Sequence, residues 1–113
     1  MVGATTYNSR AETADALREL MARAPRDGVI GALHAMADRR DATDLLSGIT
    51  CPVQVVSGGE DTFTLPAELR ALADAIPTAR LDVIEHAGHA CAFERPAAFN
   101  HVVSEFLATL LYD

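Results

Sequence analysis

The apolar residues in the first half of the chain recur with helical spacing. Over residues 10–24 they fall at i, i+3, i+4 and i+7, and over residues 27–37 they again mark one face, so we expect two amphipathic helices there. Ser9 and Glu12 fit a capping box, which predicts that Ser9 is the N-cap of the first helix. Asp41 is placed to cap a short third helix. The first half is therefore predicted to be helical.

The second half contains short apolar runs rich in β-branched residues. Residues 53–56 and 81–84 are two such runs, each followed by a loop that contains glycine, and they predict strands. Between them, residues 65–76 show helical spacing. After them, residues 96–110 carry the most regular apolar stripe of the chain, opened by Pro96. The predicted order is three helices followed by β-α-β-α.

This order predicts an α/β fold with two parallel strands. A strand–helix–strand unit with so short a connection is expected to be parallel and right-handed. Two parallel strands make a poor sheet by themselves, because such strands are normally covered on both faces and paired with others. Three arrangements stay open: strands added from another molecule, a sequence cut from something larger, or helices that cover a minimal sheet unusually well.

The composition fits one folded domain and excludes several classes of partner. The chain has 113 residues, of which 50% are hydrophobic. Its net charge is −7 and its nine basic residues are scattered, whereas a nucleic-acid surface needs clustered basic residues. No apolar stretch approaches the roughly 20 residues that cross a bilayer, and the start lacks the features of a signal peptide. We therefore expect a cytoplasmic protein without a membrane or nucleic-acid partner, in which Cys51 and Cys91 are reduced thiols.

Two loops carry the candidate chemistry. Asp61 follows the first predicted strand in Gly-Gly-Glu-Asp, and His89 follows the second in Ala-Gly-His. Because loops after parallel strands leave the same edge of a sheet, the carboxylate and the imidazole are expected to meet, as an Asp–His pair that serves a nucleophile must. The alternative is that Asp61 only caps a turn or a helix and that His89 is an ordinary surface histidine.

The segments around both loops resemble the α/β-hydrolase superfamily. Residues 51–61, in which a strand preceded by Pro ends in Gly-x-x-Asp, resemble the family's acid-bearing segment, and Pro66 opens the next helix as it does there. Three further pieces of the family pattern follow in order: Ile-Pro at 76–77, Gly-His at 88–89 and Glu-x-Pro-x-x-Phe at 94–99. The resemblance implies that Asp61 is the acid of a catalytic triad and that His89 is its general base.

The family's nucleophile has no counterpart in this sequence. The family places it in Gly-x-Ser-x-Gly, between a strand and a helix upstream of the acid. The four serines lie outside any such motif: Ser9, Ser47, Ser57 and Ser104. Residues 1–50 instead resemble the end of the helical cap that many members insert before the acid strand. We therefore divide the chain into a cap-like segment, 1–48, and a β-α-β-α part of the hydrolase core, 49–113.

The resemblance implies the C-terminal portion of a serine hydrolase that cleaves a small-molecule ester or lactone through an acyl-enzyme, without a cofactor. Because the serine is missing, the chain alone is expected to be inactive or nearly so. The alternative is a non-catalytic remnant or assembly module that binds a partner chain through its sheet edge. A missing N-terminal half, or a homodimer that joins two pairs of strands, could complete the sheet.

Two other chemistries are disfavoured by the sequence. Cys91 lies two residues after His89, and side chains at that spacing usually point apart, so its thiol is not expected to be the nucleophile. The histidines and carboxylates of the two loops are metal-ligand types, but the helical His-Glu-x-x-His signature is absent and a metal would compete with the Asp–His pair.

Overall fold

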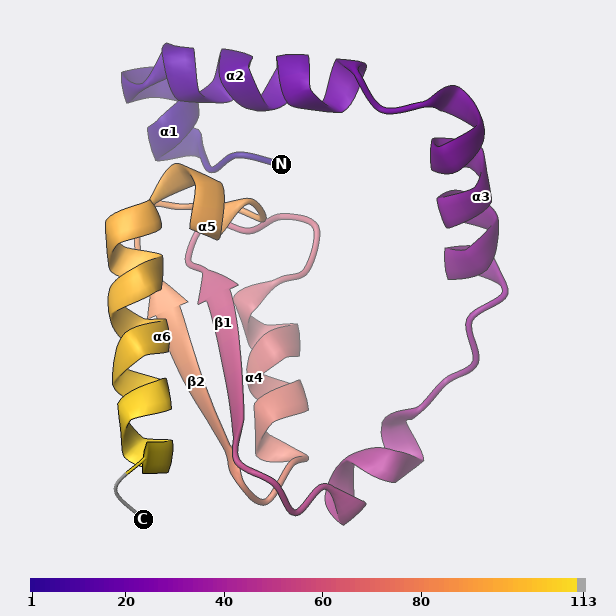
Figure 1. Cartoon of the computed structure of the whole chain (residues 1–113), viewed down its shortest axis with the longest axis vertical. Helices are drawn as coiled ribbons and strands as arrows, with labels where there is room; N and C mark the ends of the chain where they lie inside the picture. The colour runs from indigo at the N-terminus through magenta and orange to yellow at the C-terminus, as the bar shows by residue number, and fades with distance from the viewer. Residues whose placement is uncertain (112–113) are drawn as a thin grey trace.

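The second half of the chain forms a parallel two-stranded sheet in the computed structural model, which describes residues 1–111 (Figure 1). Strand β1 (Val53–Gly58) pairs in register with β2 (Ala79–Ile84), and helix α4 (Pro66–Asp74) connects them. This confirms the predicted α/β class with parallel strands. Within the described residues β1 pairs with β2 alone, so its second edge has no strand beside it.

Two helices cover the sheet. Figure 1 shows α4 and α6 (Pro96–Leu111) on opposite sides of the strands. On the α6 side, a cluster of side chains forms the hydrophobic core: Ile84, Ala87 and Cys91, with Val56, Phe99 and Val102 packed against them. Burial of this apolar surface supplies the main force that holds the strand ends in place. The loops that carry Asp61 and His89 therefore begin at strand ends that are held by this core.

The first half folds into four short helical elements. They are α1 (Ala4–Ser9), α2 (Ala11–Ala22), α3 (Arg26–Ala37) and the 3₁₀ helix η1 (Thr43–Gly48). We call the segment from α2 to η1 the arch, because it runs away from α1, past open space, and returns to the start of β1 (Figure 1). Neither α3 nor η1 has a buried residue.

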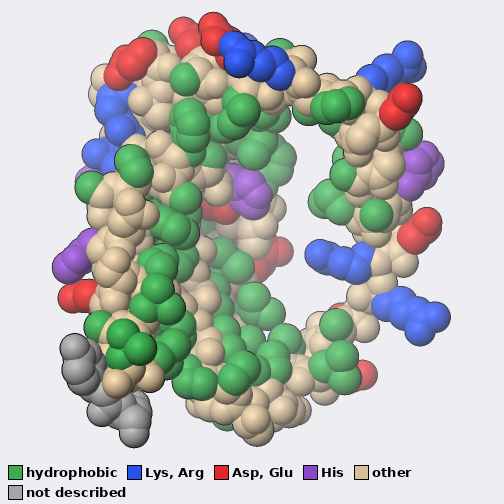
Figure 2. All heavy atoms as spheres, in the orientation of Figure 1, with side chains coloured by type: hydrophobic (Ala, Val, Ile, Leu, Met, Phe, Trp, Pro, Cys, Tyr) green, Lys and Arg blue, Asp and Glu red, His purple; other side chains and the backbone are tan. Residues whose placement is uncertain are grey.

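The arch makes the molecule open. Figure 2 shows an empty space between the arch and the rest of the chain, bordered on both sides by hydrophobic side chains. The radius of gyration is 16.0 Å, whereas a compact domain of this size has one of about 13 Å. Four apolar residues of α3 are at least 40% exposed: Val29, Ile30, Leu33 and Met36.

Most of the predicted elements are confirmed, and two caps are wrong. The helices and strands expected from the apolar pattern are present, with ends shifted by a few residues. Ser9 does not cap α2, because it lies in α1 and its hydroxyl donates to the carbonyl oxygen of Thr5; the N-cap is Arg10. Ala42, not Asp41, is the N-cap of η1, although Asp41 accepts from the Thr43 amide. The sequence patterns also missed α1 and the short helix α5 (Cys91–Glu94).

Two findings of the structure bear on the expectations about membrane spans and cysteines. No helix within residues 1–111 is long and apolar enough to cross a membrane. Cys51 is exposed, Cys91 is buried, and both are free thiols. The division into segments 1–48 and 49–113 stays a prediction.

Candidate active site

The ends of the two strands bring the chemistry-bearing loops together. Gly58 and Ile84 are the last paired residues of the ladder. Backbone pairing then continues past the strands, because the Gly59 amide donates to the Ile84 carbonyl at 2.9 Å and the Glu60 amide donates to the Ala87 carbonyl at 2.8 Å. The loops after β1 and β2 are thereby joined before either reaches its candidate residue.

Asp61 and His89 are hydrogen-bonded. His89 Nδ1 lies 2.9 Å from Asp61 Oδ2. A carboxylate can only accept, so Nδ1 carries the proton and donates it; in the neutral form of the ring, Nε2 is then the acceptor. The Asp61 side chain is 4% exposed and that of His89 is 42% exposed. The structure thus brings together the two residues that the sequence singles out, with the acid buried and the base open to solvent.

The second oxygen of Asp61 is also fixed. Asp61 Oδ1 accepts from the backbone amides of Phe63 at 2.8 Å and Thr64 at 3.1 Å. Burial by itself raises the pKa of this carboxyl, but the bonds from His89, Phe63 and Thr64 outweigh it, and the net pKa is lowered below its usual value. Asp61 is therefore an anion at neutral pH, with an orientation set by three donors.

Close backbone packing explains why the last residue of β1 is the glycine Gly58. A Cβ on Gly58 would lie 2.6 Å from the Ala87 oxygen and would overlap the Gly88 oxygen, so only glycine fits there. The Phe63 ring lies 5.5 Å from the His89 ring at 42°, and it covers one side of the imidazole. The loops after β1 and β2 can approach each other closely because the Gly58 backbone packs directly against that of Ala87 and Gly88.

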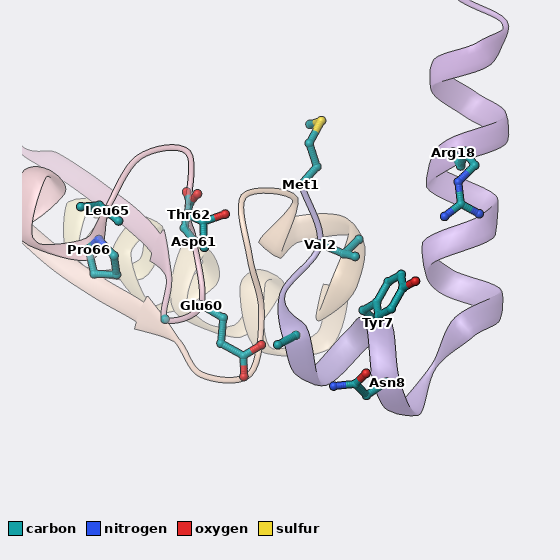
Figure 3. Close-up of a pocket in the computed structure, with 12 residues that line it drawn as sticks. Met1, Val2, Tyr7, Asn8, Arg18, Glu60, Asp61, Thr62, Leu65 and Pro66 are labelled. Carbon is teal, nitrogen blue, oxygen red and sulfur yellow. The ribbon is translucent and has the colours of Figure 1, made fainter.

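A cavity of about 850 Å³ lies beside Asp61. Figure 3 shows its wall, which comes from the N-terminal segment, from α1 and α2, and from the loop after β1. In that view Glu60 reaches toward α1, and its carboxylate accepts from both the amide and the hydroxyl of Thr5. These bonds lower the pKa of Glu60. The cavity is open to solvent, and Asp61 is one of its lining residues, whereas His89 is not.

Two acidic residues at this edge were not among the predicted catalytic residues. Glu60 and Glu94 both accept from the N-terminal segment, and Glu94 is completely buried. Glu94 belongs to the Glu-x-Pro-x-x-Phe pattern, which was the only signal in the sequence that singled it out. His86, in the same loop as His89, has a φ of 58°, the one non-glycine residue with positive φ in the described part of the chain.

The structure also bears on the two alternative chemistries, a Cys91 nucleophile and a metal site. Cys91 is buried, and burial raises the pKa of its thiol, with the Glu94 charge adding to the effect. A thiol that resists ionisation is a poor nucleophile. Within residues 1–111, no three His, Cys, Asp or Glu side chains are placed to hold a metal ion.

The serines do not complete the pair. Ser57 lies on β1, is 1% exposed, and donates to the neighbouring Gly58 carbonyl. His89 forms one side-chain hydrogen bond within the described chain, the bond to Asp61. The free Nε2 of His89 thus has no hydroxyl partner among residues 1–111.

Comparison with known proteins identifies the family. Residues 3–102 match the model of the alpha/beta hydrolase family. The chain belongs to this family. Among solved structures, the thermophilic esterase from Thermogutta terrifontis superposes on this alpha/beta hydrolase with a TM-score of 0.93 and 33% identity, over 96% of this chain and 40% of the esterase.

Two further relatives illustrate the range of the family. "Est816 as an N-Acyl homoserine lactone degrading enzyme" has a TM-score of 0.78 and 34% identity, over 93% of this chain and 42% of Est816. "Putative carbamate hydrolase RutD" of Escherichia coli O17:K52:H18 is 31% identical over 87 residues, which are 77% of this chain and 31% of the relative. This alpha/beta hydrolase chain therefore spans well under half the length of the proteins it matches.

Proposed function

We propose that this chain supplies the acid and the base of a serine-hydrolase triad, with Asp61 as the acid and His89 as the base. The observation that carries the proposal is the 2.9 Å bond from His89 Nδ1 to the buried carboxylate of Asp61. In the neutral ring this bond leaves Nε2 unprotonated, on a side chain that is 42% exposed. This is the state in which an imidazole can accept a proton from a hydroxyl.

In this proposal each residue has one role. His89 Nε2 would take the proton of an attacking serine and return it to the leaving alcohol, so that an acyl-enzyme forms and is then hydrolysed. Asp61 holds the ring in the Nδ1–H tautomer and stabilises the positive charge that the ring acquires. The low pKa of Asp61 keeps it anionic throughout this cycle. Neither step needs a cofactor.

The relatives support a carboxylic ester or a lactone as the substrate. One is described as an esterase, one as a lactone-degrading enzyme and one as a carbamate hydrolase. All three names describe attack on an acyl carbon bonded to a heteroatom. We propose a small-molecule substrate that reaches His89 Nε2, in a pocket formed mainly by residues outside this chain, since His89 does not line the cavity beside Asp61.

We propose further that the nucleophile comes from a missing N-terminal half of the same domain. The chain spans 31–42% of the three relatives, and none of its serines lies in Gly-x-Ser-x-Gly. Loss of the serine from such a triad costs about as much as loss of the whole triad, roughly a millionfold in a protease example. The free cysteines, Cys51 and Cys91, accord with the reducing cytoplasm, where we propose that the protein acts.

The test compares the chain alone with the chain plus a complement. The purified chain is given 4-nitrophenyl acetate and a phosphonate probe. It is then mixed with the part of the T. terrifontis esterase that this chain does not span, where we expect the motif serine. The proposal predicts background turnover alone, and after mixing a turnover that His89→Ala removes and His101→Ala, on the exposed face of α6, leaves intact.

Two results would contradict the proposal. The first is a covalent probe adduct on the isolated chain together with turnover above that of His89→Ala, because the chain would then hold its own nucleophile. The second is turnover in the mixture that does not depend on His89. The first result would contradict the need for a nucleophile from outside the chain, and the second would remove His89 from the role of base.

A second candidate function is an assembly module that binds a partner chain. It is favoured by the free edge of β1, which lacks a strand among the described residues, and by the exposed apolar face of α3. Unpaired strand edges are natural templates for another chain. Light scattering separates the possibilities: a mass of twice 12.0 kDa supports a homodimer that joins two sheets, and a monomer excludes it.

A further inference from the structure

Glu94 is a completely buried carboxylate without a cationic partner. Its residue exposure is 0%, and it takes part in no ion pair within residues 1–111. A buried charge of this kind is costly unless strong hydrogen bonds compensate it. The function proposed above does not use Glu94. Its burial therefore needs a structural explanation of its own.

Both oxygens of Glu94 accept from backbone amides. Oε1 accepts from Gly88 at 2.8 Å and Oε2 accepts from Gly3 at 2.8 Å. Gly88 directly precedes His89, and Gly3 directly precedes α1. A single carboxylate in α5 thus joins the loop that carries the candidate base to the N-terminal segment of the chain, through bonds of the charge-assisted kind.

The backbone around Gly88 is packed too closely to admit a side chain. A Cβ on Gly88 would lie 2.5 Å from the Gly3 nitrogen and 2.7 Å from the Val2 carbonyl carbon. On its other side, Gly88 is in contact with Gly58, at the end of β1. Two residues later, the Ala90 amide donates to the Met1 carbonyl at 3.3 Å. The backbone of Gly88 is therefore clamped between β1 and the N-terminal segment.

We infer that Glu94 is a positioning residue for His89, which it orients through the Gly88 amide. With Gly88 held on one side by β1 and on the other by Glu94 and Gly3, the Cα of His89 has a fixed place relative to Asp61. The consequence for catalysis rests on the proposed function, but the positioning itself does not, and it is measured without substrate. Residues 1–3 take part in the same clamp, because Gly3 shares the carboxylate.

Substitution by glutamine tests this directly. Two N–H groups converge on the two oxygens of Glu94, and Gln offers one oxygen and one NH₂ group, so Glu94→Gln leaves one backbone donor facing another donor. Glu85→Gln is the matched control, because Glu85 is exposed, lies in the same loop and loses the same charge. A merely structural role of Glu94 would lower stability without changing the state of the His89 ring.

The readout is the ring of His89 in the intact chain, followed by ¹⁵N-resolved NMR below the unfolding transition of each variant. In the wild type and in Glu85→Gln, the Nδ1 proton is expected to be protected by its bond to Asp61. In Glu94→Gln, its exchange is expected to accelerate by on the order of tenfold, the effect of leaving one buried donor unpaired. A folded Glu94→Gln with the same Nδ1 exchange as the control would overturn the inference.

If Glu94→Gln does not fold, amide exchange in the wild-type chain decides. The inference predicts that the Gly3 and Gly88 amides exchange as slowly as those of the β1–β2 ladder, together with the Nδ1 proton of His89. Free exchange of both amides while the Nδ1 proton persists would contradict it. Neither measurement uses turnover, so an inactive chain can still confirm the positioning role of Glu94. A negative result would contradict that role and leave the triad proposal unaffected.

Discussion

The loop edge of the sheet and the arch differ in how much of their conformation is fixed by contacts. At the loop edge, the carboxylates of Asp61 and Glu94 are buried and fully bonded, and backbones touch at glycines. In the arch, α3 and η1 bury no residue and Gly31 has open space around it. What differs is whether the described chain supplies the surface that covers them.

This contrast separates what the chain can do alone from what needs a complement. The loop edge carries an acid–base pair in which the three donors that orient Asp61 are all present. The arch and the free edge of β1 expose the surfaces against which the rest of a hydrolase domain would pack. The same substitution made in both regions should therefore have unequal effects, and the following predictions use that inequality.

The largest effect is expected for Asp61→Asn in the complemented enzyme. Asn can donate to Nδ1 and so favour the wrong tautomer of His89, and the corresponding change in a serine protease lowers kcat by about 10⁴-fold. Asp41→Asn in the arch is the matched control, because Asp41 also accepts from the amide two residues later, that of Thr43. Ester hydrolysis by each variant mixed with its complement measures the difference. Equal rates for both variants would contradict the assignment of the acid.

The second effect concerns core packing. Ile84→Ala removes a side chain that is 3% exposed, so it should lower the free energy of unfolding by about 2–5 kcal/mol. Leu33→Ala in α3 removes one that is 60% exposed, and a change within about 0.5 kcal/mol is expected. Urea unfolding of the isolated chain gives both values. A comparable loss in Leu33→Ala would show that the arch is packed in solution.

The third effect tests the two glycines. Gly58→Ala places a methyl group against the backbone of Ala87 and should destabilise by about 1–3 kcal/mol. Gly31→Ala has free space within a helix, so it should stabilise by about 0.5–1 kcal/mol. The signs are opposite, which makes the pair a sensitive comparison in thermal unfolding. Destabilisation by Gly31→Ala would mean that something packs closely against α3.

These contrasts also show what the sequence could and could not predict. The strands, α4 and α6 follow from local apolar periodicity, and the Asp61–His89 contact follows from parallel strand topology and the family pattern. Helix α1 has no such pattern, because its start is held by Glu60 and Glu94, which are distant in the sequence. Carboxylate-to-amide bonds over that separation leave no local periodicity.

The Ser9 cap was wrong for a related reason. The local pattern of Ser9 and Glu12 is correct for a capping box, but the hydroxyl of Ser9 has another acceptor, the Thr5 carbonyl, once α1 forms. Tertiary contacts that stabilise α1 thus override a local signal. The bond between Glu94 and Gly3 could not be predicted from local pattern either, because the two residues lie near opposite ends of the chain.

The smallest effect is a pH dependence of stability. The pKa of Asp61 is lowered in the folded chain, so its contribution is fully present above the unfolded value, 3.8, and is lost as the pH falls through the lower folded value. Urea midpoints below pH 4 should therefore fall less steeply in Asp61→Asn than in the wild type. Asp41→Asn, at an exposed site in the arch, should change this slope less. An unchanged slope in Asp61→Asn would contradict the depressed pKa.

The most direct test of the account is the protonation state of the His89 ring. We predict that ¹⁵N NMR of the intact chain near pH 8 finds the proton on Nδ1, bonded to Asp61, and a bare Nε2. His101, which is exposed on α6, serves as the internal reference. A proton on Nε2 with a bare Nδ1, or a ring indistinguishable from that of His101, would contradict the claim that this chain presents an oriented acid–base pair.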